Sequence, residues 1–552
     1  MIYQRCITFL FIFFSLSELA FGQKINLSKL EKSAKAAISK CYPASVRIWG
    51  FDTVKKIQTS SQFSGVVVTA EGHILTVSHA IIPKQSYKVL FPDGREVMAK
   101  ALGRVGFSDM QNRPDIGMMK ITTNGNWPVA EMGYSNSLKE NEPCLSISYP
   151  ETLNQRLPSV RFGYITHVQN QFGFVQSTAK MEPGDSGGPL YDFLGRVIAM
   201  HSRCGESENE NYEVPVDLYR KYWKALQQPI DYKVLPTDTQ TINVDLLRNE
   251  ISASLEMPKL NSVSTPAKAM GTSLQLNSNR GDFKSLVLAT IILSKGRYHV
   301  ISKSSMVFNN PKVCYEGQYL DATILKRDMD NDLVLLRLND KLKNAILIAA
   351  IGSKEVFRTE NIGNFLVSIL PLENRVSILG SIPFEQPRKF SAGYLGAPAR
   401  FTNEIIELRN PIAGSPAQVA GLRAGDRVTQ INDVLIAKAA DYGIELVKYN
   451  PGDTVTVQGK RTGSAFSYKI VLGRRPVGTH LADQFRGGKS IRLDGFKKVF
   501  SHDTILKPDE CGSPVFDIQG NFYGINIARF SRTTTLVLPA NVVRRFIDPV
   551  IR

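Results

Sequence analysis

The feature that most constrains the fold is a long series of short apolar segments, each bounded by glycine, proline, asparagine or aspartate. The series begins after Cys41. Short strands at such spacing predict a closed β-barrel or sandwich and not a sheet of alternating strands and helices. We therefore expect a mainly β protein, with strands that include 46–48, 64–69, 74–77, 116–121 and 197–200.

Two stretches depart from this pattern. Residues 26–40 carry apolar side chains at helical spacing with lysines between them, which predicts a helix. The stretch from 235 to about 279 is polar and contains one weakly helical segment, so we interpret it as a linker. With 552 residues, the chain is too long for one core, and we expect two to four domains.

The first 22 residues have the features of a secretory signal peptide. Arg5 precedes a mostly apolar run over 7–16, and Ala20 and Gly22 supply the small residues of a cleavage site. The run is too short to span a bilayer well, and no later segment approaches the length of a membrane helix. We expect cleavage after Gly22, export to the periplasm or the extracellular space, and no membrane span afterwards. A retained N-terminal anchor is the alternative.

Composition argues against several classes of protein. The net charge of +17 favours anionic partners, but no nucleic-acid motif accompanies it, so we expect no nucleic-acid partner. The cysteines after residue 22 are too few and scattered for a disulfide scaffold or a zinc ribbon, so we expect neither a metal nor a cofactor. Export permits a disulfide, for example Cys144 with Cys204, but the sequence does not set the pairing.

Three segments carry residues for nucleophilic catalysis. Residues 75–80 (LTVSHA) contain His79, Asp115 opens DIGMMK, and Ser186 is central in MEPGDSGGPL. Acyl transfer needs a nucleophile, a base and an acid that orients the base. Alone, each segment fits an ordinary strand end, turn or glycine-rich loop. Together, in one β-rich region, they predict a catalytic triad.

The glycines around Ser186 predict an oxyanion hole. They permit a tight loop that directs the backbone N–H groups of Gly184 and Ser186 at one point, where a tetrahedral oxyanion would sit. A separate pair of motifs lies further on. Residues 393–396 (GYLG) precede a strand, and 414–432 predict a short helix ended by Gly421, a tight turn and another strand.

The first set of segments resembles the trypsin-like fold, and most closely the HtrA group of exported, PDZ-bearing serine proteases, over about residues 40–225. The resemblance implies a chymotrypsin-like double β-barrel, with His79 and Asp115 from the first barrel and Ser186 from the second. Where the HtrA group commonly has asparagine before the nucleophile, this chain has Asp185, from which we infer no specificity.

The resemblance also implies how a substrate binds. Its backbone would pair with the strand 199–202, which contains Met200 and His201, and Met181 and Met200 would wall part of the pocket. Because we see no acid in that pocket, we expect a medium-sized apolar side chain before the cleaved bond.

The second set of motifs resembles a PDZ domain. Such a domain adds an extended peptide to a sheet edge and holds its terminal carboxylate with backbone N–H groups. By resemblance, the carboxylate loop is Tyr394, Leu395 and Gly396. The alternative is a domain that packs only for structure, with a blocked groove.

Residues 288–552 repeat the first unit around this PDZ segment. Counting seven residues from Gly72 and from Gly296 aligns His79 with Lys303. Similar spacing matches Asp332 with Asp115, and Cys511 with Ser186.

We therefore expect a degenerate second double barrel with the PDZ domain inserted in it. Lysine is normally protonated at neutral pH and cannot act as the base. The nearest histidines, His299 and His502, are unsuitably placed. The second unit is thus predicted to be a pseudoprotease that holds the PDZ domain and braces the active unit.

The predicted function is that of an exported serine endopeptidase acting on unfolded or damaged proteins, with peptide C-termini bound at the PDZ domain. The alternative is a PDZ-based binding or chaperone-like envelope protein with minor proteolysis, and a homo-oligomer is left open. The expected domains are the signal peptide 1–22, the protease domain 23–228, the linker 229–279, the first part of the degenerate unit 280–392, the PDZ domain 393–478 and the second part 479–552.

Overall fold

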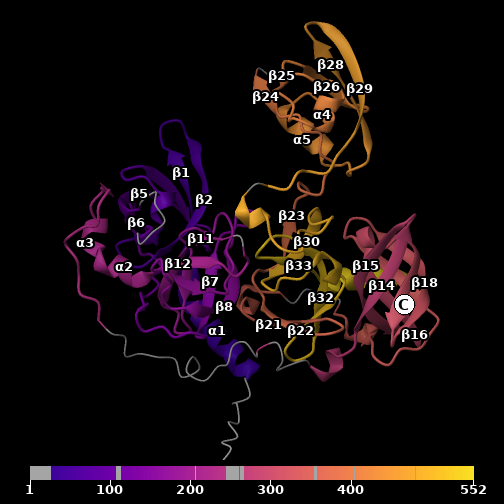
Figure 1. Ribbon diagram of the computed structural model, residues 1–552, viewed down its shortest axis with the longest axis horizontal. Helices are drawn as coiled ribbons and strands as arrows, with labels where there is room; N and C mark the ends of the chain where they lie inside the picture. Colours follow the sequence, from indigo (N-terminus) through magenta and orange to yellow (C-terminus); the bar gives the residue numbers. More distant parts are fainter. Residues whose placement is uncertain are drawn as a thin grey trace, which may run out of the picture.

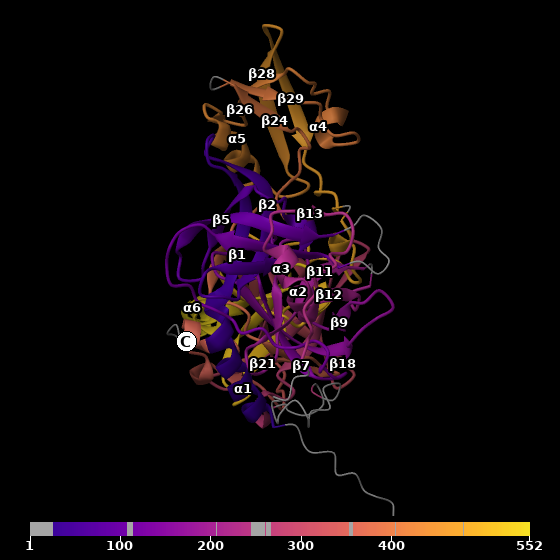
Figure 2. The same ribbon diagram turned by 90° about the vertical axis from the view of Figure 1, so that its left-hand side faces the viewer.

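The computed structural model describes residues 26–106, 114–205, 207–243, 260, 266–352, 357–402, 405–478 and 480–551. The predicted signal peptide, 1–22, lies outside the described residues. The fold is mainly β, as predicted, with two successive double-barrel units and a smaller domain inserted in the second. Figures 1 and 2 show this smaller domain standing clear of the two units at one end of the molecule.

The first unit opens with the predicted helix, α1 (Leu27–Cys41). Its buried stripe is apolar, as the helical spacing required, and consists of Leu27, Leu30, Ala34, Ala37, Ile38 and Cys41. The first barrel follows in the order β4-β1-β2-β3-β6, and β5 closes it by pairing with both β4 and β6. Its strands are β1 (Ser45–Asp52), β2 (Ile57–Val67), β3 (His73–Thr76), β4 (Ser86–Leu90), β5 (Glu96–Val105) and β6 (Ile116–Ile121).

The second barrel of this unit is a closed ring in the order β10-β11-β12-β9-β8-β7. Its strands are β7 (Pro143–Ser148), β8 (Ser159–His167), β9 (Val175–Ser177), β10 (Pro189–Tyr191), β11 (Val197–Cys204) and β12 (Asn211–Pro215). Two short helices, α2 (Val216–Lys221) and α3 (Trp223–Leu226), come next, and β13 (Asp231–Tyr232) then pairs in parallel with β5.

The second unit repeats the first barrel strand for strand. The order β17-β14-β15-β16-β19, with β18 between β17 and β19, matches that of β1 to β6. The strands are β14 (Ser273–Arg280), β15 (Phe283–Ser294), β16 (Arg297–Lys303), β17 (Asn309–Tyr315), β18 (Gln318–Asp328) and β19 (Leu333–Leu338), and β20 (Ile346–Leu347) pairs with β15. β14 begins within the segment 229–279, which was expected to be a linker. The segment forms a strand there because buried Leu274 and Leu276 alternate with polar side chains.

The second barrel of this unit has the order β22-β21-β31-β32-β33-β30-β23. The position of β8 is shared by two strands, β22 (Asn374–Ile378) and β23 (Phe384–Gln386), and the chain leaves β23 to enter the inserted domain. It returns at β30 (Phe496–His502) and ends with β31 (Pro514–Asp517), β32 (Phe522–Arg529), β33 (Thr535–Pro539) and α6 (Ala540–Ile551); β21 is Phe365–Ile369.

The inserted domain has a sheet in the order β24-β25-β26-β28-β29, and β27 pairs with β26. Two helices and a separate apolar core accompany it. The elements are β24 (Ala399–Thr402), β25 (Ile405–Leu408), α4 (Pro416–Val419), β26 (Arg427–Ile431), β27 (Val434–Leu435), α5 (Ala439–Leu446), β28 (Thr454–Arg461) and β29 (Ser464–Val471).

The two protease-like units are joined by partly buried polar contacts. Glu31 on α1 accepts a hydrogen bond from the backbone N–H of Phe365 on β21 at 2.6 Å. Asp503 accepts from the backbone N–H of Phe162 in the first unit at 2.6 Å and from that of Ile378 in the second at 2.9 Å. Within the described residues, no helix combines the length and apolar character needed to cross a membrane.

Candidate active site

The loop that carries Ser186 joins β9 to β10 and depends on two glycines. Gly184 has a φ of 96° and Gly187 a φ of 77°. A Cβ on Gly184 would lie 2.5 Å from the carbonyl oxygen of Tyr149, and one on Gly187 would lie 2.4 Å from that of Ser64. The shape of this loop therefore requires glycine at both positions.

His79, Asp115 and Ser186 meet at the junction of the two barrels. His79 lies in the short turn after β3, and Asp115 lies directly before β6. Nε2 of His79 is 3.1 Å from Oγ of Ser186, and its Nδ1 is 2.7 Å from Oδ2 of Asp115. The imidazole is thus within reach of the hydroxyl, and the carboxylate lies on the opposite ring nitrogen. General-base activation of a serine needs this arrangement.

Asp115 is buried and accepts further hydrogen bonds. Its Oδ1 accepts from the hydroxyl of Ser78 at 2.6 Å and from the backbone N–H of His79 at 3.1 Å, and its Oδ2 accepts from the hydroxyl of Ser202 at 2.7 Å. Burial alone would raise the pKa of this carboxyl, but the contacts from His79, Ser78 and Ser202 outweigh it and hold the pKa well below its usual value. Asp115 therefore stays ionised and orients the imidazole.

The predicted oxyanion donors are the backbone N–H groups of Gly184 and Ser186. Around them, the loop is closed by hydrogen bonds from the N–H of Asp185 to the carbonyl of Glu182 at 3.0 Å and from Gly188 to Asp185 at 2.7 Å. Within the described parts of the chain, neither the Gly184 nor the Ser186 N–H donates a hydrogen bond to the protein. Both are available to an oxyanion.

Asp185 is part of the frame of the loop. Its carboxylate forms a buried ion pair with Arg161, at 2.8 and 3.1 Å, and accepts from the hydroxyl of Ser148 at 2.8 Å. It also accepts from the N–H of Glu182 at 2.9 Å. With both oxygens engaged, this carboxylate does not bear on substrate choice.

The three predicted substrate-binding residues, Met181, Met200 and His201, are all buried. Nε2 of His201 is 2.7 Å from Oγ of Ser146. Its Nδ1 is 3.4 Å from Oε1 of Glu213, a separation that makes the contact electrostatic and not a well-formed hydrogen bond. Their role in binding substrate stays a prediction.

Glu213 on β12 is a buried acid that the sequence analysis missed. Burial raises its pKa, and the hydroxyl of Ser177 donates to it at 2.8 Å. Glu213 is fully buried against His201 and Ser177, so the absence of an acid from the pocket stays a prediction. The signal in the sequence was a lone glutamate in an otherwise apolar strand end, NYEVP.

The loop between β11 and β12 is held by a loop of the second unit that occupies the equivalent place between β32 and β33. Arg532 is fully buried and donates to the carbonyl oxygens of Gly205 at 2.9 Å and of Ser207 at 2.7 Å. Arg529 forms an ion pair with Glu208 at 2.7 Å.

A third contact reaches the nucleophile loop itself. The hydroxyl of Thr533 donates to the Glu182 carboxylate at 3.0 Å, and Thr152 donates to the other oxygen of the same carboxylate. Burial raises the pKa of Glu182. The second unit thus packs directly against two loops that adjoin Ser186.

The loop Tyr394–Gly396 lies at the start of the inserted domain. The N–H of Tyr394 already donates to the carbonyl of Gly473 at 2.8 Å, so this residue has no free backbone donor. In the described structure, the N–H groups of Leu395 and Gly396 donate to no protein acceptor. β24 follows at the edge of its sheet, so one of its sides has no partner strand among the described residues.

The residue at the base position of the second unit is Ser305 and not Lys303. Thr76 pairs with Gly117, which lies two places after Asp115. Ser302 pairs with Val334, which lies two places after Asp332. Thr76 and Ser302 are therefore equivalent, and His79, three places after Thr76, corresponds to Ser305. The alignment through glycine was wrong by two residues because Gly296 lies six places before Ser302, whereas Gly72 lies only four places before Thr76.

Lys303 instead fills the space beside Asp332. Its ammonium is fully buried and donates to Oδ2 of Asp332 at 2.6 Å and to the carbonyls of Arg492 and Ile527 at 2.6 and 2.8 Å. Ser305 also donates to Asp332 through both its N–H and its hydroxyl. No imidazole contacts this aspartate within the described residues.

Cys511 occupies the nucleophile position but is buried, and burial raises the pKa of its thiol. Asp509, which replaces Gly184, lies in the short turn Pro508–Glu510 and has no positive φ. The oxyanion geometry of the first unit is therefore not repeated. Cys144 and Cys204 are both free thiols, so no disulfide joins them.

Comparison with known proteins agrees with this architecture. A family model for the trypsin-like peptidase domain matches residues 63–200, and one for the PDZ domain matches residues 393–472. A probable periplasmic serine endoprotease, DegP-like, from Pseudomonas savastanoi pv. phaseolicola is 24% identical over 419 residues, which span 74% of this chain and 78% of that protein. The chain thus combines a trypsin-like peptidase domain with a PDZ domain and is similar to DegP-like periplasmic serine endoproteases.

Other similarities cover different shares of the chain. A protein with the same description from Pseudomonas fluorescens is 29% identical over 169 residues, 29% of this chain and 34% of that relative. Among solved structures, a serine endoprotease from Yersinia pestis matches with a TM-score of 0.31 at 15% identity, covering 80% of this chain and 98% of that one. The HtrA-type protease AlgW with tripeptide matches with a TM-score of 0.30 at 16% identity, covering 80% and 97%.

Proposed function

We propose that the protein is an exported serine endopeptidase that cleaves unfolded or damaged proteins. His79 takes the proton of Ser186 as the serine oxygen attacks the scissile carbonyl, and the N–H groups of Gly184 and Ser186 stabilise the oxyanion. His79 then protonates the leaving amine, and water hydrolyses the acyl-enzyme. The observation that carries the proposal is the pair of His79 contacts, 3.1 Å to Ser186 and 2.7 Å to Asp115.

The remaining features support an exported, peptide-binding enzyme. The predicted signal peptide and the periplasmic description of the relatives support a site of action outside the cytoplasm. The PDZ domain supports capture of peptide C-termini through Leu395 and Gly396, next to the open edge of β24. Unfolded chains are the expected substrates, because cleavage requires an extended backbone at the nucleophile.

A second candidate is a binding or chaperone-like protein in which proteolysis is minor. The second unit favours it, because Lys303 lies against Asp332 and Cys511 is buried. About half of the chain would then bind or brace without catalysing a reaction.

The test is to incubate the purified protein with unfolded casein and with a folded protein of similar size. We expect cleavage of casein alone, and loss by several orders of magnitude in Ser186→Ala. Ser39→Ala, on the exposed face of α1, is the matched control and should cleave normally. Undiminished cleavage by Ser186→Ala would refute the proposal. No cleavage by any form, with casein kept from aggregating, would favour the second candidate.

A further inference from the structure

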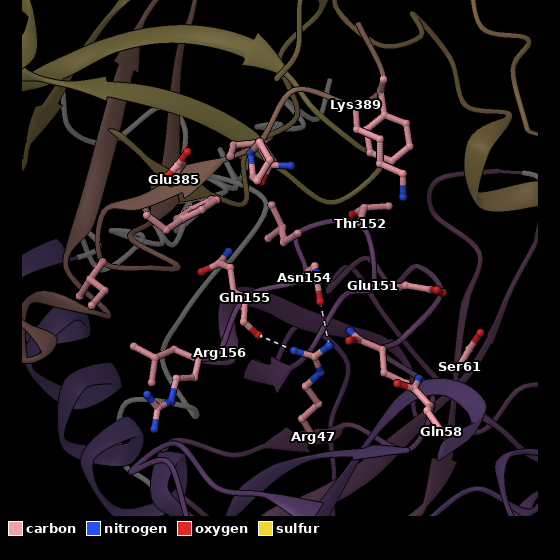
Figure 3. Close-up of a pocket in the computed structure, with 18 of the residues that line it drawn as sticks. Arg47, Gln58, Ser61, Glu151, Thr152, Asn154, Gln155, Arg156, Glu385 and Lys389 are labelled. Atoms are coloured by element: carbon pink, nitrogen blue, oxygen red, sulfur yellow. Dashed lines mark hydrogen bonds between the residues drawn. The ribbon is translucent and has the colours of Figure 1, made fainter. Parts of the chain in front are cut away.

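A cleft of about 1140 Å³ lies between the two units, away from the triad. The first unit supplies Arg47, residues 58–62 of β2 and the loop 151–157, and the second unit supplies 382–387, 389 and 390, which include β23. Figure 3 shows Gln58 and Ser61 of β2 across the cleft from Glu385 and Lys389. This volume exceeds the roughly 300–1000 Å³ of ordinary small-molecule pockets, which indicates a larger occupant.

The cleft is continuous with the nucleophile loop. The N–H of Glu151, in the cleft wall, donates to the carbonyl of Pro183 at 2.8 Å. On the other wall of the first unit, Gln62 lies two residues before Ser64, whose N–H donates to the carbonyl of Ser186 at 2.9 Å. A chain that leaves Ser186 on this side therefore enters the cleft.

The direction of the substrate follows from the two sides of the loop. The residues before the scissile bond are proposed to pair with β11, which contacts the loop through the N–H of Gly187 and the carbonyl of His201 at 2.8 Å. The cleft borders the opposite side of the loop, through Ser64 and Glu151. The chain after the scissile bond is the part that runs there.

The walls suit an extended polypeptide. Over 57–64, β2 pairs with β1 on one side, and it pairs with β3 only through Val66 and Val67 further along. Across the cleft, β23 is the last strand of its sheet. Each of these strands has an edge without a partner strand in the described structure, and such edges accept an added strand through backbone hydrogen bonds.

The side chains that line the wall of the second unit determine which groups it can bind. Gln386 is 5% exposed, lines the cleft, and its Oε1 has no hydrogen-bond partner in the described structure. A buried acceptor of this kind is costly unless a ligand satisfies it. Phe384 and Phe390 line the same wall, and Leu153 lines the opposite one. The occupant thus presents backbone N–H groups together with apolar side chains.

We propose that this cleft binds the segment of the substrate chain that follows the scissile bond, and that the degenerate unit supplies one of its walls through β23. The inference rests on the proposed endopeptidase function. It gives the second unit a direct part in substrate selection, with a preference for apolar residues after the cleaved bond.

The test compares two substrates that share the same residues before the scissile bond. One is a chromogenic anilide with no amino acid after the bond, and the other is an internally quenched peptide with six residues after it. We expect the ratio of kcat/KM for the long to the short substrate to fall about tenfold in Phe384→Ala and in Ser61→Trp, which alter opposite walls. Leu372→Ala and Val54→Trp, at exposed positions outside the cleft, are the matched controls and should keep the ratio.

The outcomes separate this inference from the proposed function. Turnover of both substrates with an unchanged ratio in both cleft variants would overturn the role of the cleft alone. No turnover of either substrate by the intact protein would overturn the endopeptidase function and the inference with it. Melting temperatures show whether a cleft variant is folded. If one of the two is not, the ratio measured for the variant on the opposite wall tests the inference.

Discussion

The guanidinium of Arg532 in the second unit donates to the carbonyl oxygen of Gly205 in the first, at 2.9 Å, with the arginine fully buried. The two residues lie 327 positions apart in the sequence, in loops that occupy equivalent places in the two copies. The second unit thus holds the loop between β11 and β12 of the first unit and contacts the loop that carries Ser186.

The first prediction concerns this brace. Arg532→Ala leaves the carbonyls of Gly205 and Ser207 without their donors, at a cost of about 1.5–3 kcal/mol for hydrogen bonds from a charged group. We expect a lower melting temperature and about a tenfold loss in kcat/KM on a short anilide substrate. Arg545→Ala, exposed on α6, is the matched control. An Arg532→Ala protein with wild-type kinetics would show that the contact has no bearing on the site.

The second prediction concerns Lys303. Lys303→Met leaves the buried carboxylate of Asp332 without its counter-ion, and breaking a buried pair in this way costs about 3–5 kcal/mol. The double variant with Asp332→Asn should recover much of the loss. Urea unfolding of the single and double variants measures both effects. Equal stabilities for Lys303→Met and the intact protein would contradict a structural role for the pair.

The third prediction concerns His502, which is buried and whose pKa burial lowers to about 4. Its folded pKa lies below the unfolded value of about 6.5. The folded state therefore binds fewer protons, and the contribution of His502 to stability is lost as the pH falls from about 6.5 to about 4.

Relative to His502→Gln, the intact protein should lose about 3 kcal/mol of unfolding free energy between pH 7 and pH 4. Burial raises the pKa of neighbouring Asp503 to about 6 and so has the opposite trend, but Asp503 is present in both proteins and cancels in the difference. Urea unfolding at several pH values gives the two curves. Parallel curves would contradict the buried, neutral state of His502.

The fourth prediction concerns the PDZ loop. Because Tyr394 has already donated its N–H to Gly473, capture of a carboxylate falls to Leu395 and Gly396. Peptides with a free, apolar C-terminus should bind about 10- to 100-fold more tightly than their amidated forms, in line with about 1.5–3 kcal/mol for hydrogen bonds to a charged group. Calorimetry with the intact chain measures both affinities. Equal affinities would argue against carboxylate capture.

The parts of the site that the sequence predicted are those in which the chemistry restricts the residue type. A serine nucleophile requires a base, an acid and a glycine-rich loop, so His79, Asp115, Ser186 and Gly184 could be identified from their order and spacing. Ser78 and Ser202, which hold Asp115, could not, because a serine beside a strand fits many roles.

Other features could not be predicted from the sequence, because they depend on the three-dimensional arrangement of the chain. Lys303 was aligned with the base because Gly296 lies two places further than Gly72 from the aligned position of its strand, a difference that the sequence pattern does not show. The contacts of Arg529 and Arg532 join segments more than 300 positions apart, and local patterns carry no information about such contacts. The cleft likewise exists only once the two units pack together.

The most direct test of the central claim is labelling with a fluorophosphonate probe, followed by mass spectrometry of the digested protein. We predict one adduct per chain, on Ser186, absent from Ser186→Ala and formed about 10⁴-fold more slowly in Asp115→Asn, where the imidazole takes the wrong tautomer. Cys511 should carry none. A folded protein without an adduct on Ser186, or undiminished labelling of Ser186→Ala, would contradict this account.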